Sequence, residues 1–215
     1  MMESATLQDR IYRAAGRSAA ITGTACDLFR PNGLFDPLLF CNRLLRLPAA
    51  FLPIGGRLRK PVIEPMWEGV FDAAYTQPGD ILRRLSDGQI YYVAAQQPLL
   101  PVLCIRAPRL VNLSRPASPA NAGLNLYGGV VAATDTSLAE AWPASILMAG
   151  DQGTGLASIE AELTPGNWQV LLPPSLKLAL STSDIISDDQ GRTGIIAAIE
   201  TTDLGTRLTA RQAST

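Results

Sequence analysis

A pattern of two strands, a polar turn and a third strand occurs twice, in residues 79–106 and 183–211. In both copies the turn ends in a glycine, Gly88 or Gly191, and a pair of alanines follows six and seven residues later. A glycine that closes a polar turn between β-branched or aromatic segments is typical of a β-hairpin. The matched spacing therefore predicts two copies of a hairpin that is followed by a third strand.

A three-stranded unit buries too little apolar surface to be stable alone, so each copy is expected to belong to a separate small domain. We therefore expect a mainly β fold with two small β-barrel or sandwich domains related by the internal repeat. An N-terminal α-helix is expected over residues 1–22, because Leu7 and Ile11 share one face of a helix that Ser4 or Thr6 can cap.

The composition divides the rest of the chain. Residues 23–115 are expected to form the first β domain with a proline-rich insertion, because each proline removes a backbone donor and disfavours central strands. Residues 116–129 are rich in Ser, Pro, Ala, Asn and Gly, which predicts a linker. The second β domain is then expected over residues 130–215.

Several kinds of chemistry are excluded by residue content. The chain has no histidine, which removes imidazole acid–base catalysis, histidine-activated nucleophiles and histidine-containing zinc sites. Cys26, Cys41 and Cys104 lack the spacing of a metal or redox motif, and we expect them to be buried thiols of a protein folded in a reducing cytoplasm. No metal and no cofactor is expected. A signal-peptide pattern and a long apolar run are also missing, so no membrane contact is expected.

Two carboxylate patterns leave an aspartate-dependent hydrolase as an alternative. Asp188 and Asp189 are adjacent, but neighbouring side chains in a strand or turn diverge, which favours a solvated turn over an acid–base pair. Asp135-Thr136-Ser137 is similar to the triplet of aspartic proteases, with serine in place of the usual glycine. We therefore expect no catalytic residues and a chain that is not an enzyme.

Charge is distributed unevenly along the chain. Residues 1–115 carry 14 basic and 9 acidic side chains, a net charge of +5, whereas residues 116–215 carry 4 and 10, a net charge of −6. This asymmetry suits head-to-tail contact between copies of the chain, basic surface against acidic surface. It also suits a basic half that faces nucleic acid, but the arginines are scattered, and we favour the contact between copies.

Two kinds of residue are candidates for interface contacts. Some arginines are expected to face a partner chain or a DNA channel, with a solvated face as the alternative. Leucines in two proline-rich loops are expected to fill pockets on partners, because buried apolar anchors supply most of the binding free energy at interfaces. The candidates are Arg43, Arg46, Arg83, Arg84, Arg106 and Arg109, with Leu99, Leu100, Leu171 and Leu172.

Several segments spread over most of the chain carry a resemblance to known proteins. They are Arg10–Arg13, Asp27–Pro31, Leu47–Phe51, Gln77–Leu82, Ala94–Pro101, Trp142–Leu147 and Asp203–Ala210. As a set they resemble a poorly characterised group of proteins encoded in the structural cassettes of tailed bacteriophages and prophages.

The end of the chain is also similar to small β-barrel head–tail joining and stopper proteins, in which a Gly-Asp, a turn, a Gly-Arg and two strands recur. Asp184–Ile186 and Gly191–Arg192 match that pattern here. The chain departs from it by having two such units and a proline-rich insertion, so its place among neck, tail tube and baseplate stays open.

The resemblance implies a structural subunit of a tailed-phage virion, assembled in the host cytoplasm. It implies a homo-oligomeric ring at the head–tail neck or in the tail, next to portal or adaptor, tail-tube or baseplate proteins, with non-specific contact to packaged DNA. The alternative from another class is a β-barrel glycan-binding module of a tail tip or baseplate, which predicts exposed aromatic side chains.

Overall fold

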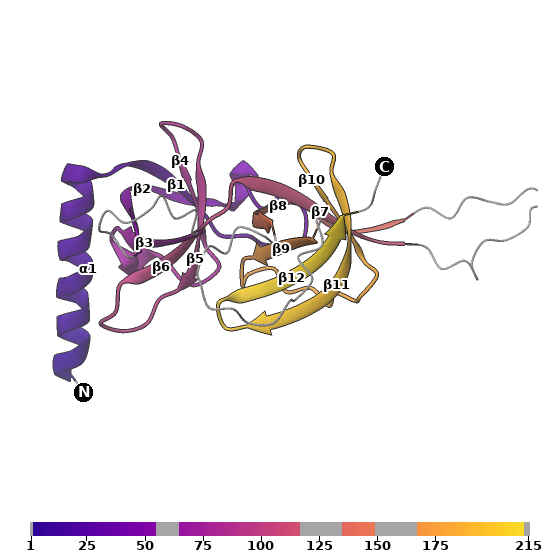
Figure 1. The fold of residues 1–215 in the computed structure, drawn as a ribbon. Helices are drawn as coiled ribbons and strands as arrows, with labels where there is room; N and C mark the ends of the chain where they lie inside the picture. Colours follow the sequence, from indigo (N-terminus) through magenta and orange to yellow (C-terminus); the bar gives the residue numbers. More distant parts are fainter. Residues whose placement is uncertain (1, 55–64, 117–134, 149–166, 213–215) are drawn as a thin grey trace, which may run out of the picture.

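The described residues form one α-helix, two short 3-10 turns and two closed six-stranded β-barrels (Figure 1). The structure is a computed structural model that describes residues 2–54, 65–116, 135–148 and 167–212. The expected fold, mainly β with two small barrels and an N-terminal helix, is confirmed. Figure 1 shows the helix against the first barrel, and the second barrel on the side away from the helix.

The two barrels have the same topology. Their strands are antiparallel and follow the same order, first-second-third-sixth-fifth-fourth, before the ring closes. The first barrel contains β1 (Thr24–Phe29), β2 (Arg43–Pro53), β3 (Met66–Val70), β4 (Ile81–Arg84), β5 (Ile90–Ala95) and β6 (Val102–Arg106). The second contains β7 (Arg109–Arg115), β8 (Thr136–Met148), β9 (Asn167–Leu172), β10 (Ile185–Asp188), β11 (Thr193–Thr202) and β12 (Gly205–Gln212).

The predicted hairpin repeat is confirmed at the level of strand register. Tyr92 on β5 pairs with Ile81 on β4, and its counterpart Ile195 on β11 pairs with Ile185 on β10. Just after Tyr92 and Ile195, a β-bulge interrupts the pairing with the last strand of the repeat, which is β6 in the first barrel and β12 in the second. Two barrels that share a bulge as well as a register are duplicates of one unit, because a one-residue slip would turn every side chain to the other face.

The duplication extends to the first three strands of each barrel, beyond the predicted repeat. Leu47–Ala49 on β2 and Trp142–Ala144 on β8 have a proline at the same place and the same register against the first strand of their barrel. Trp67 on β3 and Trp168 on β9 likewise take equal places. The duplicated unit is therefore the whole barrel, of which the predicted repeat is the second half.

The boundary between the domains needs a correction. The strand β7 precedes the expected linker, but it pairs with β8 and β10 and so belongs to the second barrel. The two barrels meet between β6 and β7, at Ala107 and Pro108, and the segment 116–129 lies within the β7–β8 connection. Apart from Pro116, that segment lies outside the described residues.

Each barrel encloses its own apolar core. In the first barrel the Tyr91 and Phe51 rings stack with their centroids 3.7 Å apart. In the second barrel, Trp142 and Trp168 are fully buried and fill much of the interior. Some equal positions are filled by different side chains, such as Leu47 in the first barrel and Trp142 in the second, since a core requires the right total volume more than particular residues.

The helix α1 (Met2–Thr22) packs against β2, β3 and the short 3-10 turn η2 (Ala73–Tyr75) of the first barrel. Its contact is made by Tyr12, which packs on the barrel core, and by the small residues Gly16 and Ala19. Leu7 and Ile11, which were expected to share one face of the helix, are 49% and 39% exposed and do not form the main contact with the barrel. No helix in the described part of the chain is long and apolar enough to cross a membrane.

Candidate interaction surfaces

The outer wall of the first barrel is an interface. Side chains alternate along a strand, so Leu28, Leu82 and Val93 point into the barrel while their neighbours point out. Those outward neighbours are also buried, at 3% exposure or less, because the second barrel covers them together with the segment that precedes β2. They are Phe29, Ile81, Tyr92, Ala94 and Ile105, with Ala107 beyond the end of β6 and with Leu38 and Leu171 packed against them.

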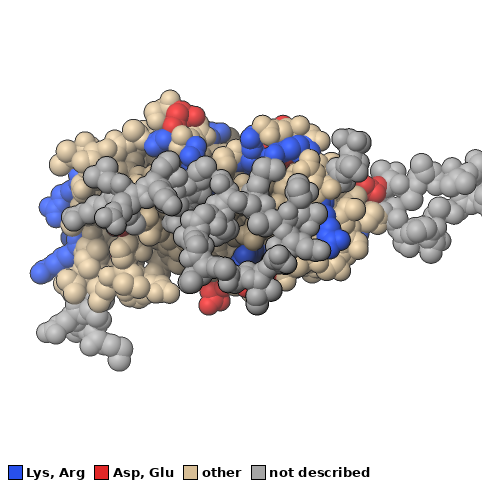
Figure 2. Space-filling model, viewed as in Figure 1, with Lys and Arg blue, Asp and Glu red and all other residues tan. Residues whose placement is uncertain are grey.

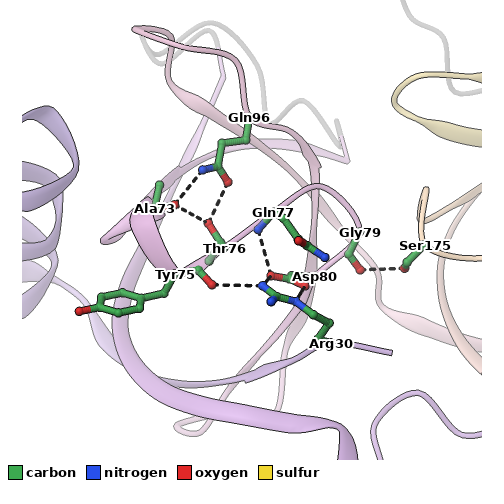
Figure 3. A network of polar contacts seen from close by, with 9 residues as sticks. All are labelled: Arg30, Ala73, Tyr75, Thr76, Gln77, Gly79, Asp80, Gln96 and Ser175. Carbon is green, nitrogen blue, oxygen red and sulfur yellow. Dashed lines mark hydrogen bonds and ion pairs between the residues drawn. The ribbon is translucent and has the colours of Figure 1, made fainter. Parts of the chain in front are cut away.

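Close polar contacts hold the two barrels together at the edge of this interface. Ser175 donates a hydrogen bond from its hydroxyl to the Gly79 carbonyl at 2.7 Å (Figure 3). Gly79 has a φ of +93°, and a Cβ at this position would lie 2.7 Å from the Ser175 Cβ. The Trp142 indole donates to the Leu34 carbonyl at 2.7 Å, and so ties the loop after β1 to the second barrel. The two barrels are therefore joined by polar contacts as well as by the apolar interface.

The same Arg–Asp clasp occurs in both barrels. Arg30 donates from Nε and Nη2 to both carboxylate oxygens of Asp80, at 2.8 and 2.7 Å (Figure 3). Arg115 makes the same bidentate contact to Asp184, at 2.8 and 2.9 Å. In each case a backbone N–H three residues before the aspartate also donates to the carboxylate. The clasps tie the loop before the fourth strand to the end of the first strand, which closes the barrel.

Burial explains why each clasp needs its arginine. Asp80 and Asp184 are 1% and 2% exposed, and a buried carboxylate is stable only when it is paired. The hydrogen bond from Arg115 holds the pKa of Asp184 below its ordinary value, and the Ser181 N–H adds to the effect. The sequence signal that could have identified the clasps is the Leu-x-Arg-Pro that both copies share, at Arg30 and Arg115.

Three of the predicted arginines surround Asp27. Arg46 and Arg43 contact its carboxylate at 2.8 and 3.2 Å, and Arg83 lies opposite Asp27 in the β1–β4 register. The hydrogen bond from Arg46 lowers the pKa of Asp27, and the charges of Arg43, Arg46 and Arg83 add to this. The Arg83 guanidinium also lies 5.0 Å from the centre of the Phe29 ring. These four charged groups leave a local excess of two positive charges on the first barrel.

The other predicted arginines are not part of that cluster. Arg84 pairs with Asp87 within the β4–β5 turn, and Arg109 lies 3.6 Å from Asp189. Arg106, at the end of β6, donates its backbone N–H to the Pro65 carbonyl at 2.7 Å. In Figure 2 the basic side chains appear at separate places over both barrels and do not merge into one patch on the face shown.

The predicted leucines divide into two pairs. Leu99 and Leu100 are 48% and 56% exposed in the β5–β6 loop, where they are free to contact a partner. Leu172 is 1% exposed inside the second barrel, and Leu171 packs against the first barrel. The expectation for Leu171 and Leu172 is therefore corrected: they are strand residues with alternating directions, and each fills a core of its own chain.

The carboxylates of the hydrolase alternative point to different partners. Asp188 accepts hydrogen bonds from the Arg192 guanidinium at 2.6 and 2.8 Å, whereas Asp189 faces Arg109. Burial acts to raise the pKa of Asp188, but the bonds from the Arg192 side chain and from two backbone N–H groups outweigh it and lower the pKa. The two aspartates thus belong to separate ion pairs, with Arg192 and with Arg109. Asp135 is exposed next to the start of β8.

The cysteines differ in exposure. Cys26 and Cys104 are fully buried in the first barrel, as expected, and burial raises the pKa of Cys26 to about 11. Cys41 is exposed and free, so the expectation of a buried thiol was wrong there. Within the described residues, no group of three or more Cys, Asp or Glu side chains is placed to hold a metal ion.

The most extensive candidate surface is therefore the outer wall of a barrel, which within this chain already binds another barrel. The chain matches no protein-family model, no curated protein and no solved structure.

Proposed function

We propose that the chain is a non-catalytic structural subunit that binds copies of itself and neighbouring proteins through the outer walls of its barrels. The observation that carries the proposal is the contact between the two barrels, in which six outward residues of the first barrel are buried to 3% exposure or less. A barrel wall of this kind is a protein-binding surface, and the chain carries two copies of the barrel.

The electrostatics of the buried carboxylates support a scaffold. Asp27, Asp80, Asp184 and Asp188 are each within 3 Å of an arginine side chain, and each is 5% exposed or less. Catalysis by a carboxylate pair requires pKa values that are pushed apart so that one group keeps a proton. The pKa values of Asp27, Asp184 and Asp188 are all lowered, which favours the ionised form in each.

The resemblance to tailed-phage proteins supports a virion as the setting. The subunit then assembles in the host cytoplasm into a homo-oligomeric ring at the head–tail neck or in the tail. Portal or adaptor, tail-tube and baseplate proteins are its neighbours, and the arginine cluster around Asp27 is its contact with packaged DNA.

The test is the mass of the purified full chain, measured by light scattering after gel filtration over a wide concentration range, alone and with portal or tail-tube proteins. We expect a defined oligomer or a stable complex with one of these proteins. A chain that stays monomeric alone and with each partner refutes the proposal. An Asp135→Asn or Asp188→Asn substitution that abolishes a measurable hydrolytic turnover refutes the non-catalytic part.

A glycan-binding module is the second candidate, because exposed aromatic rings lie near each other in the sequence. Phe40 is 79% exposed and Phe35 is 50% exposed, and aromatic rings of this kind can stack on sugars. This candidate predicts binding of the intact chain to host polysaccharide that a Phe35→Ala, Phe40→Ala double substitution removes. Unchanged binding in that variant, or no binding by the intact chain, rejects it.

A further inference from the structure

Because the barrels are duplicates, every position on one has a counterpart on the other. The wall that the first barrel uses against the second is formed by Phe29, Ile81, Tyr92, Ala94 and Ile105. Strand register gives the counterparts on the second barrel, which we call the end face. In the same order they are Ser114, Ile185, Ile195, Ala197 and Arg211.

The end face is largely open to solvent. Ile195 is 49% exposed, whereas its counterpart Tyr92 is fully buried. Ala197 and Arg211 are also exposed, and Ile185 is half-buried. Ile195 and the neighbouring Ile185 therefore place two β-branched apolar side chains on outward strand positions of the end face.

The surface that receives the first barrel also has a counterpart. On the second barrel, Leu147, Gln169 and Leu171 line the groove beside Tyr92 and Ile105, which has a volume of about 550 Å³. The β2–β3 and β8–β9 registers match these residues to three side chains on the first barrel, which we call the receiving face. They are Leu52, Glu68 and Val70; Leu52 is 51% exposed, and Glu68 and Val70 are half-buried.

We propose that the end face of the second barrel docks on the receiving face of the first barrel in another copy, and so repeats between chains the barrel contact seen within one. The inference rests on the proposed self-association and adds the surfaces that carry it. The contact joins two different surfaces, so it is heterologous and either closes into a ring or continues as a filament.

Charge supports a second copy as the occupant. Within the chain, Ile105 and Gln169 line the same groove. Arg211 is the counterpart of Ile105, and Glu68 is the counterpart of Gln169. Docking in the same geometry places Arg211 of one copy and Glu68 of the next in the lining of one groove, where opposite charges attract. Neither side chain has an ion-pair partner among the described residues. The opposite net charges of the two halves of the chain, +5 and −6, favour the same head-to-tail order.

The experiment uses sedimentation velocity of the full chain and of three single variants: Ile195→Asp, Arg211→Glu and Glu68→Arg. We expect the mass of the unsubstituted chain to rise with concentration. Each variant is expected to weaken association about tenfold or more, because it buries an unpaired charge or places two like charges together in the interface. Ile21→Asp is the matched control, because Ile21 is 85% exposed on α1, outside both faces, and its substitution leaves association unchanged. Circular dichroism verifies that each variant is folded.

A mixture provides the sharpest test. Arg211→Glu makes both faces of a copy acidic at this position, and Glu68→Arg makes both basic, so each variant associates with itself only weakly. Equal amounts of the two are expected to restore association in a 1:1 ratio. If the mixture stays dissociated, the contact between Arg211 and Glu68 is refuted. If the unsubstituted chain assembles and all three variants assemble equally well, the proposed docking is refuted but the structural function is not. If the unsubstituted chain stays monomeric at every concentration and binds neither portal nor tail-tube proteins, both are refuted.

Discussion

Replacing Arg115 by Met removes the cation that neutralises a buried carboxylate of the second barrel. The substitution keeps most of the aliphatic stem but deletes two charge-assisted hydrogen bonds to Asp184, at 2.8 and 2.9 Å. Asp184 is 2% exposed, and of its hydrogen bonds only the one from the Ser181 N–H would remain. The expected effect is a loss of stability, because an unpaired carboxylate is left in the protein interior.

The magnitude follows from the exposure of the two partners. Breaking a buried ion pair by removing one partner costs about 3–5 kcal/mol, but the Arg115 side chain is 44% exposed, so water partly replaces it and we expect about 2–3 kcal/mol. Asp184→Asn leaves an arginine that water can reach, so its cost is smaller, about 1–2 kcal/mol. The double substitution is expected to cost less than the sum of the two by about 1 kcal/mol or more, because the second change removes what the first left unpaired.

The assay is urea unfolding followed by tryptophan fluorescence, with Trp142 and Trp168 as probes in the same barrel. Arg207→Met is the matched control, because Arg207 and Glu200 form an exposed pair at 3.7 Å whose loss is expected to cost at most about 0.5 kcal/mol. Equal small costs for Arg115→Met and Arg207→Met, or strict additivity of the Arg115 and Asp184 substitutions, would refute the reasoning.

Three further outcomes are expected. Gly79→Ala should destabilise the chain by about 1–3 kcal/mol in the same assay, because a Cβ would lie 2.7 Å from Ser175 on a backbone with a φ of +93°; a neutral result would contradict the tight junction between the barrels. Iodoacetamide should modify Cys41 alone in the folded chain, since the other two thiols are buried; mass spectrometry that finds early modification of Cys26 or Cys104 would contradict their burial. The free energy of unfolding should fall as the pH is lowered below about 4, the ordinary pKa range of aspartate. A carboxyl group whose pKa is lowered by folding stabilises the fold only while it is ionised. Unfolding curves that do not change between pH 5 and about pH 3 would contradict the lowered pKa values of Asp27, Asp184 and Asp188.

The hairpin repeat could be predicted because its turns leave a local mark. Gly88 and Gly191 have φ values of +71° and +77°, a conformation that favours glycine, so both copies carry the residue at the same place. The first three strands leave weaker marks, because the proline and the tryptophan that recur in the second and third strands stand at different spacings in the two copies. Leu47 and Trp142 occupy equal positions but differ in size, and the spacing to the hairpin differs because the connecting loops differ in length.

The shared Leu-x-Arg-Pro marks the arginine of each clasp, but neither its aspartate partner nor the barrel boundary could be predicted from the local sequence. Arg30 and Asp80 are 50 residues apart, and only the closure of the barrel brings them together. The strand β7 lies before a segment whose composition indicates a linker, and composition identifies loops without saying which sheet a strand joins. Leu171 and Leu172 precede two prolines, a pattern that predicts a loop, although they end the strand β9.

The shared wall between the barrels also affects the order of events during synthesis. The strands of the first barrel are complete at residue 106, whereas β9, which carries Leu171, ends only at residue 172. At about 5–20 residues per second, several seconds of translation separate the two. During that interval the nascent chain presents the apolar side chains of Phe29, Ile81, Tyr92 and Ile105 to solvent, and the second barrel can cover them only after β9 has been synthesised.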